Sequence, residues 1–132
     1  MNRQLKDLTR GLMKPEAIPD IAISGLKFNS AHICRGDLFI AIPGTIHDGH
    51  DYIHDAIANG AAAILSNGRD LGVLDVPQIK VANPRRAASV VAAEFYGHPS
   101  RDLQIIGITG TNGKTTTASI LAPILSHAGQ KT

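Results

Sequence analysis

The stretch GDLFIAIPG, residues 36–44, places five consecutive apolar residues between a glycine-aspartate pair and a Pro-Gly turn. A short apolar run that turn residues bound on both sides is typical of a strand buried on both faces of a parallel sheet. The stretch therefore predicts a buried strand over residues 38–42 that ends at Pro43.

Other elements alternate on both sides of this strand. Apolar patterning predicts strands at residues 21–23, 61–65 and 76–81, and helices at residues 3–13, 52–59 and 84–96. Asn83 and Pro84 are residue types preferred at a helix N-cap and at the first helical position. Gly97 follows as a helix stop. Strands that alternate with helices predict an α/β fold.

The composition of the 132 residues excludes several classes of protein. A hydrophobic fraction of 43% and a charged fraction of 18% indicate a folded chain rather than a disordered one. No stretch is long and apolar enough to span a membrane, and residues 1–10 lack the apolar region of a secretory signal. A net charge of +2 and 4% aromatics argue against nucleic acid as a partner. With Cys34 as its single cysteine, the chain fits the reducing cytoplasm.

A glycine-rich turn between a predicted strand, 103–109, and a predicted helix, 115–127, carries the clearest chemical signal. It consists of Gly110, Thr111, Asn112, Gly113, Lys114, Thr115 and Thr116. Such a turn brings backbone N–H groups close to phosphate oxygens, and the helix that follows attracts anions. Lys114 would place a positive charge on the terminal phosphates of the bound group, and the Thr115 hydroxyl would bind Mg²⁺.

The turn departs from the common phosphate-loop pattern at one position. Ile108 stands where the pattern G-x-x-x-x-G-K-[ST] has its first glycine. The alternative is a generic glycine-rich turn whose Lys and Thr side chains are simply solvated. Within the predicted helix, Pro123 is expected to kink or shorten it.

The run T-G-T-N-G-K-T-T, residues 109–116, resembles the ATP loop of the Mur ligase superfamily. The preceding run, A-E-F-Y-G-H-P-S at 93–100, is similar to the approach to that loop in the MurE branch, which adds the third amino acid of the peptidoglycan stem. Three further segments resemble the uridine-nucleotide domain of that branch, namely residues 36–44, 48–53 and 56–65. The resemblance covers roughly residues 21–132.

The resemblance implies a ligase that uses ATP and Mg²⁺ to join an amine to a carboxylate of UDP-MurNAc-L-Ala-D-Glu through an acyl phosphate. It implies a UDP-MurNAc-substrate-binding domain at residues 1–102 and the start of a central ATP-binding domain at residues 103–132. Because the chain ends after a strand, a turn and a helix without the second strand of a βαβ unit, we expect the N-terminal part of a longer enzyme of cell-wall synthesis, inactive alone. Association with another copy is expected only through residues 103–132.

The resemblance also implies four contacts to the UDP-substrate. Ser30 aligns with the serine of a D-S-R triplet that contacts uridine, although Asn29 and Ala31 replace its neighbours here. The loop residues Thr45, Ile46 and His47 align with the lining of the uracil and diphosphate pocket.

Three alternatives stay open at this point. A MurF-type ligase shares the uridine-domain pattern, although the run F-Y-G-H-P-S at 95–100 argues against it. A stand-alone module that binds a UDP-sugar without catalysis is the non-enzyme alternative. Finally, the spacing of His47, His50 and His54 could ligate zinc, whereas a solvated loop is the simpler interpretation.

Overall fold

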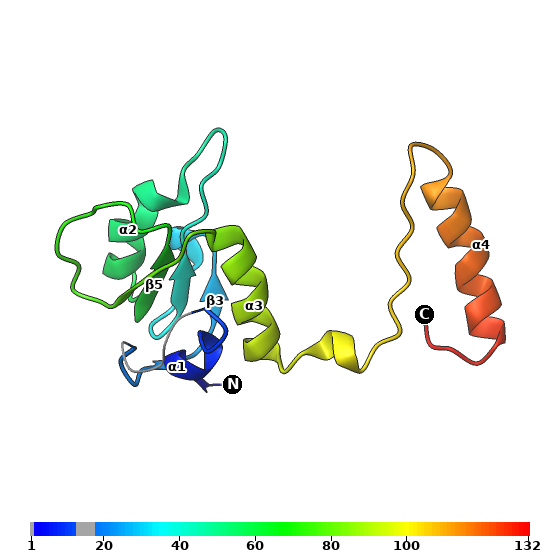
Figure 1. The fold of residues 1–132 in the computed structure, drawn as a ribbon, viewed down its shortest axis with the longest axis horizontal. Helices are drawn as coiled ribbons and strands as arrows, with labels where there is room; N and C mark the ends of the chain where they lie inside the picture. Colours follow the sequence, from blue (N-terminus) through cyan, green and yellow to red (C-terminus); the bar gives the residue numbers. More distant parts are fainter. Residues whose placement is uncertain (1, 13–17) are drawn as a thin grey trace. The chain divides into compact units, whose positions relative to one another are not determined.

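The computed structural model describes residues 2–12 and 18–132, in two compact units (Figure 1). The first unit extends to Pro99 and the second covers Ser100–Thr132.

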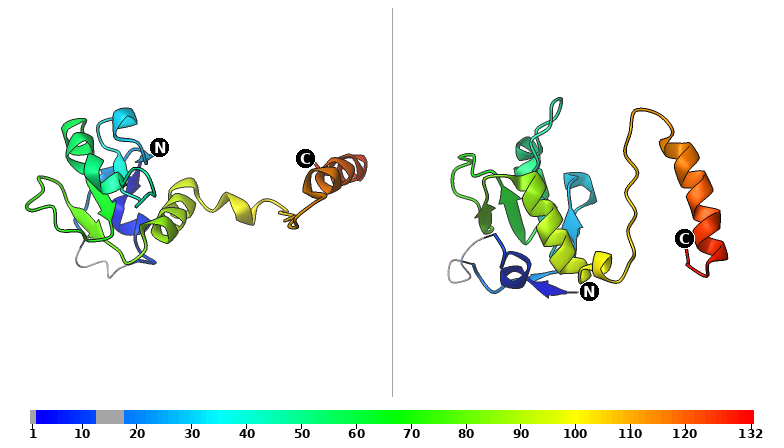
Figure 2. Two further views of the ribbon diagram at one scale, coloured as in Figure 1. Left: turned by 90° about the horizontal axis from the view of Figure 1, so that it is seen from above. Right: turned by 45° about the vertical axis from the view of Figure 1, so that its right-hand side comes forward.

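A four-stranded parallel sheet with the strand order β3-β4-β5-β6 forms the centre of the first unit (Figures 1 and 2). Its strands are β3 (Leu26–Lys27), β4 (Leu38–Ile40), β5 (Ala63–Ser66) and β6 (Gln78–Lys80). A separate antiparallel pair joins β1 (Arg3–Gln4) to β2 (Ala22–Ile23). The α/β fold expected from the sequence is confirmed.

Side chains of β4 alternate between two apolar cores. Leu38 and Ile40 belong to the first core, whereas Phe39 belongs to the second, and all three are fully buried. A strand that is covered on both faces has no solvent side on which to place a polar residue. This double burial explains the continuous apolar run that the sequence shows at β4.

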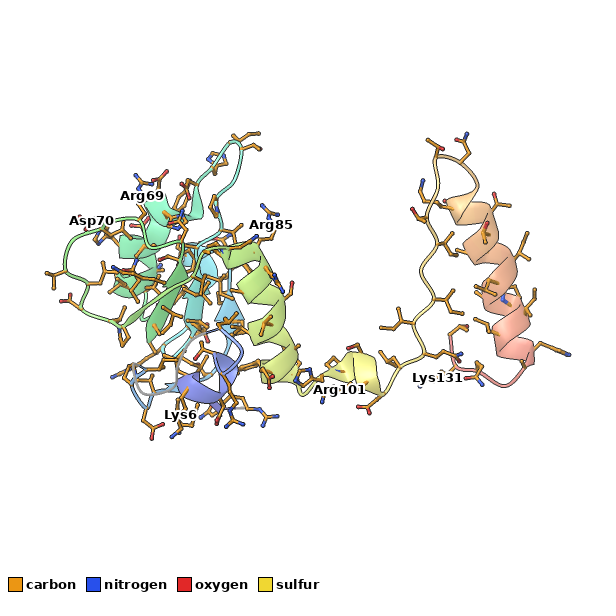
Figure 3. All side chains as sticks on the ribbon, viewed as in Figure 1. Lys6, Arg69, Asp70, Arg85, Arg101 and Lys131 are labelled. Carbon is orange, nitrogen blue, oxygen red and sulfur yellow. The ribbon has the colours of Figure 1, made fainter. Side chains whose placement is uncertain are left out.

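Helices cover the two faces of the sheet. The first core is completed by α1 (Leu5–Leu8) and α3 (Pro84–Tyr96), and the second by α2 (Ile53–Ala58). Figure 3 shows the side chains that fill the space between these layers. There are also three short 3₁₀ turns among the described residues: η2 (Ser30–His32), η3 (Gly49–Tyr52) and, at the boundary between the two units, η4 (Pro99–Arg101).

The bounds of α3 agree with the predicted helix at both ends. The Asn83 side chain accepts a hydrogen bond of 3.0 Å from the Arg86 N–H and so caps the first turn. Gly97 ends the helix with a φ of 75°, a conformation that glycine adopts without strain. Its buried residues, among them Ala87, Val91 and Phe95, recur at helical spacing and face the first core.

The helix predicted over residues 3–13 is wrong in its length. Arg3 pairs with Ile23 in the β1–β2 ladder, so the helix begins only at Leu5. The Thr9 hydroxyl donates to the Leu5 carbonyl at 2.8 Å, and turns follow up to Leu12. Residue 13 lies outside the described residues. A pairing that is distant in the sequence thus replaces the first helical turn.

The second unit contains α4 (Lys114–His127) but no strand at residues 103–109, so that expectation is wrong. A strand exists only where a neighbouring strand accepts and donates its hydrogen bonds. None of the described residues pairs with this segment. Pro123 does not shorten α4, which continues to His127 as the sequence predicts.

We predict that the second unit exchanges its amide hydrogens faster than the sheet of the first unit. No residue of α4 is buried, and Ile105, Ile120 and Ile124 expose 69%, 59% and 58% of their surface. Each apolar side chain left in water forgoes about 1.5–3 kcal/mol of burial free energy. Hydrogen exchange of the dilute monomer should show little protection at amides 104–109 and 116–125, compared with amides 38–42. Equal protection in both regions would contradict this prediction.

Candidate functional site

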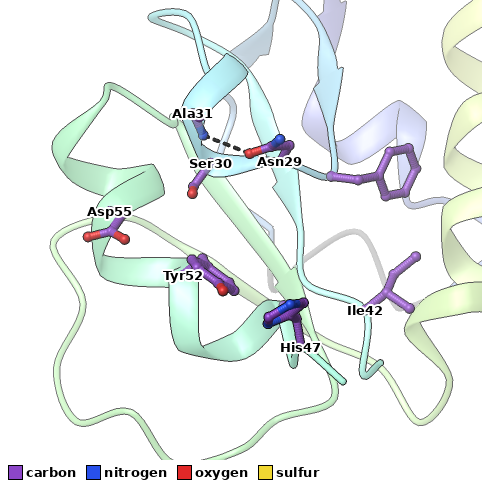
Figure 4. A pocket seen from close by; sticks show the side chains of 9 residues that line it. Asn29, Ser30, Ala31, Ile42, His47, Tyr52 and Asp55 are labelled. Carbon is purple, nitrogen blue, oxygen red and sulfur yellow. Dashed lines mark hydrogen bonds between the residues drawn. The ribbon is translucent and has the colours of Figure 1, made fainter. Parts of the chain in front are cut away.

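A cavity of about 510 Å³ lies where β3 and β4 end (Figure 4). It is lined by Phe28, Asn29, Ser30, Ala31, Ile42, His47, Gly49, Tyr52 and Asp55. The first four of these follow β3, and Ile42 follows β4. Open parallel sheets bind their ligands outside the carboxyl ends of their strands, which is where this cavity lies.

Two hydrogen bonds fix the wall that follows β3. The Asn29 side chain accepts a bond of 3.0 Å from the Ala31 N–H and caps η2 (Figure 4). The side-chain amide of Asn59, at the end of α2, donates to the Ser30 carbonyl at 3.0 Å. Ser30 is therefore held in place from two elements and is 8% exposed.

The opposite wall comes from the segment after β4. Residues 43–49, here named the β4 loop, leave the sheet and return to it, because the Gly49 N–H donates to the Ile42 carbonyl at 3.0 Å. His47 on this loop lines the cavity, as does Tyr52 on η3. Ile46 is 87% exposed.

The structure thus brings together two of the four residues expected to contact the UDP-substrate. Ser30 and His47 both line the cavity, whereas Thr45 and Ile46, which precede His47 on the β4 loop, do not line it. Sequence reasoning missed Phe28, Tyr52 and Asp55. Phe28 would have been found if β3 had been predicted, because it directly follows that strand.

A buried histidine lies just behind the β4 loop. The Nδ1 atom of His50 is 2.6 Å from the Asp48 Oδ1 atom, and its Nε2 atom accepts a bond of 3.2 Å from the Asn67 N–H. The His50 backbone N–H also donates to Asp48. This backbone bond and then the ring bond hold the pKa of Asp48 below its ordinary value of 3.8, against the opposing effect of burial; the positive charge of Arg69 lowers it further.

These contacts bear on the zinc alternative for the three histidines. Both ring nitrogens of His50 are engaged by protein groups, and His47 and His54 are exposed. Over residues 2–12 and 18–132, no group of three His, Cys, Asp or Glu side chains is arranged to hold a metal ion.

The glycine-rich turn of the second unit opens α4. Gly113 caps the helix with a φ of 79°, so that α4 begins at Lys114. The Thr117 N–H donates to the Gly113 carbonyl, which leaves the earlier N–H groups of the first turn outside the helical hydrogen-bond pattern. Free N–H groups at the start of a helix of this length suit a phosphate.

Some side chains of this turn and of α4 form hydrogen bonds within the chain, and others are exposed. The Lys114 ammonium donates to the Gly110 carbonyl and, at 3.4 Å, to the Thr111 carbonyl. The Thr117 and Ser119 hydroxyls bond to carbonyls one turn earlier. Thr115 is exposed on the first turn, and its hydroxyl is the kind of hard oxygen ligand that Mg²⁺ binds. The residues present therefore fit a phosphate with its cation.

We predict that Asp48 makes the stability of the chain depend on pH in the acid range. A folded-state pKa below 3.8 means that the carboxylate stabilises the fold fully above 3.8, and that this contribution is lost as the pH falls below 3.8 through the folded pKa. Urea unfolding at several pH values gives the free energy of unfolding of the wild-type chain and of Asp48→Asn. The wild-type chain should be the more stable of the two, and this difference in free energy should shrink on acidification. A difference that stays constant over the acid range would contradict the assignment.

The chain matches known proteins over most of its length. The model of the Mur ligase family catalytic domain matches residues 22–96. A UDP-N-acetylmuramoyl-L-alanyl-D-glutamate–2,6-diaminopimelate ligase of Geobacillus kaustophilus is 46% identical over 114 residues, which are 86% of this chain and 22% of that protein. The ligase of the same name from Pseudomonas aeruginosa is 42% identical over 89% of this chain and 25% of its own length.

Solved structures agree with these matches. A MurF structure from Acinetobacter baumannii superposes with a TM-score of 0.71 and 27% identity, over 96% of this chain and 28% of that one. The Thermotoga maritima MurF ligase in complex with ADP gives a TM-score of 0.59 and 34% identity, over 77% of this chain and 23% of that one.

Among the described residues, no helix is both long enough and apolar enough to cross a membrane.

The chain spans about a quarter of the length of the curated relatives that it matches. Because the family model covers more than half of its residues, the chain belongs to the Mur ligase family.

Proposed function

We propose that the chain supplies the UDP-substrate-binding domain and the start of the ATP-binding domain of a ligase. This ligase adds a diamino acid to UDP-MurNAc-L-Ala-D-Glu in the synthesis of peptidoglycan. The cavity beside the ends of β3 and β4, with Ser30 and His47 in its walls, is the observation that carries the proposal. The names of the curated relatives, which are diaminopimelate ligases, support this choice of substrate.

In this proposal the two units divide the work. Residues 1–102 bind the UDP-substrate and residues 103–132 begin the ATP site, and the structural division after Pro99 supports a boundary in this region. A ligase that draws on ATP would work in the cytoplasm. The activity belongs to the complete enzyme, and this chain alone is proposed to bind without catalysing.

The glycine-rich turn from Gly110 to Thr116 receives the phosphates of ATP in this proposal. ATP bound with Mg²⁺ supplies the phosphoryl group that activates the carboxylate. Backbone N–H groups of the first turn of α4 would hold the phosphate oxygens, and the Thr115 hydroxyl would hold the cation. Lys114 would exchange its bonds to the Gly110 and Thr111 carbonyls for the terminal phosphates. The ADP complex of the Thermotoga maritima ligase supports a nucleotide role for this family.

A MurF-type ligase is the second candidate, because MurF structures superpose on this chain. The identities of 27% and 34% to those structures are lower than the 46% and 42% to diaminopimelate ligases, which favours the first candidate. The two candidates differ in the UDP-substrate, which carries a dipeptide in the first and, as the name of an Acinetobacter baumannii relative indicates, a longer peptide in the second.

We predict that the 132-residue chain binds UDP-MurNAc-L-Ala-D-Glu and does not bind ATP at comparable concentrations. The cavity of the first unit is walled on two sides, whereas the turn that opens α4 is exposed throughout. Isothermal titration calorimetry with the UDP-substrate, UDP and ATP tests this expectation. ATP binding without any UDP-substrate binding would reverse the assignment of the two units.

We also predict that Lys114→Ala abolishes ligation by the complete enzyme but leaves binding of the UDP-substrate nearly intact. A lysine at this position would neutralise charge on the phosphoryl group during transfer, and its removal costs transition-state stabilisation. Lys114→Arg, which keeps the charge but changes the geometry, serves as the control and should retain part of the activity. Normal turnover by Lys114→Ala would sink the proposed catalytic role.

A further inference from the structure

The β4 loop is tied at its base to the sheet. The Gly49 N–H bonds to the Ile42 carbonyl, and a Cβ atom at Gly49 would lie only 2.8 Å from the Ile42 nitrogen and 2.9 Å from its oxygen. The loop therefore returns to the end of β4 at a point where backbone packs directly on backbone. Contacts that hold the residues next to Gly49 therefore also hold the β4 loop, and with it the cavity wall that carries His47.

His50 follows this contact point, and its side chain is completely buried. A backbone N–H can only donate, so the Nε2 atom that faces the Asn67 N–H must be the acceptor. The proton of the neutral ring is then on Nδ1, where it is donated to Asp48. The hydrogen-bond partners thus select one tautomer, and this ring joins the base of the β4 loop to the residue that follows β5.

Charged groups surround this connection on several elements. The Arg69 guanidinium, on the segment after β5, lies 3.0 Å from the Asp51 carboxylate and 3.6 Å from the second oxygen of Asp48. On the other side of the loop, Arg85 of α3 donates to the Pro43 carbonyl at 3.3 Å. Figure 3 shows Arg69 and Arg85 labelled on these two elements.

These contacts differ in their expected strength. The side chain of Arg69 is 51% exposed, and exposed ion pairs contribute little. The His50 ring is closed to water, so removing one of its partners leaves a buried polar group without a hydrogen bond, which is costly. The pair of Asp48 and His50 is therefore the firmest tie between the β4 loop and the rest of the unit.

We propose that Asp48 and His50 are positioning residues for the UDP-substrate. Neither lines the cavity, but together they hold the base of the β4 loop, and with it His47 and Tyr52, at a fixed distance from Ser30 on the opposite wall. This role rests on the proposed function of the cavity. A binding wall that is free to shift must be ordered by its ligand, and this ordering weakens binding.

Two variants and one matched control test the role. His50→Phe keeps a buried ring but removes both nitrogens, and Asp48→Ala removes the acceptor of the His50 Nδ1–H. Val91→Ala is the control: Val91 is fully buried in the first core, on the face of the sheet that α3 covers, so its truncation lowers stability without touching the loop. The dissociation constant for UDP-MurNAc-L-Ala-D-Glu is measured by calorimetry and the stability by urea unfolding, all on the 132-residue chain.

We expect the dissociation constant to rise about tenfold in His50→Phe and in Asp48→Ala, and to stay unchanged in Val91→Ala. The affinity lost by the double variant should be smaller than the sum of the two single losses, because both variants remove the same hydrogen bond between the His50 ring and the Asp48 carboxylate. In the complete ligase, His50→Phe should raise KM for the UDP-substrate by about the same factor and leave kcat at saturation unchanged. If His50→Phe does not fold, Asp48→Ala decides: the Asp48 side chain is 34% exposed and belongs to neither apolar core, so its truncation leaves the His50 Nδ1–H without its acceptor but opens no cavity in a core.

Two results would overturn the inference, and they are distinguishable. The positioning role would be refuted if both variants bound the UDP-substrate with wild-type affinity. It would also be refuted if they lost no more affinity than Val91→Ala does at an equal free energy of unfolding. Either result would leave the proposed function intact. A wild-type chain that does not bind the UDP-substrate at all would refute the proposed function, and the positioning role would fall with it.

Discussion

The first unit depends on the burial of β4 from both sides. Leu38, Phe39 and Ile40 are each fully buried, and their side chains point alternately into two cores. Neither face of such a strand can be left to solvent, so one must be covered by α1 and α3 and the other by α2. Only the two ends of β4 can therefore be reached by solvent or by a ligand. Its carboxyl end is the place where the β4 loop begins and where the cavity opens.

Polar groups with satisfied hydrogen bonds mark both ends of this apolar strand. At its start, the buried Asp37 carboxylate accepts bonds of 2.9 Å from the Cys34 N–H and 3.1 Å from the Ser24 hydroxyl. Beyond its other end, the buried His50 ring is bonded on both nitrogens. Buried polar groups are costly unless they are paired, so these contacts favour a single arrangement of the strand ends over shifted ones.

The two candidate sites arise from the chain in different ways. In the second unit the features that suit an anion lie within a few consecutive residues, because Gly113 and the first turn of α4 supply a bend and free N–H groups. In the first unit no short segment forms the cavity. Residues 28–31 and 42–55 become neighbours only because β3 and β4 pair in parallel, with Leu26 opposite Leu38. The candidate phosphate site therefore depends on the local conformation of one turn, whereas the cavity depends on the pairing of strands in the sheet.

The sequence alone determined what depends on neighbouring residues: the buried strand β4, although it ends at Ile40 rather than at residue 42, α3 with its cap at Asn83, and the turn that opens α4. These features follow from local apolar patterning and capping chemistry, which the chain carries in short windows. Tertiary structure decided where distant segments pair. The β1–β2 ladder shortened the first helix, and residues 103–109 form no strand because none of the described residues pairs with them. The same long-range packing brought Ser30 and His47 to the walls of one cavity, an arrangement that no local pattern encodes.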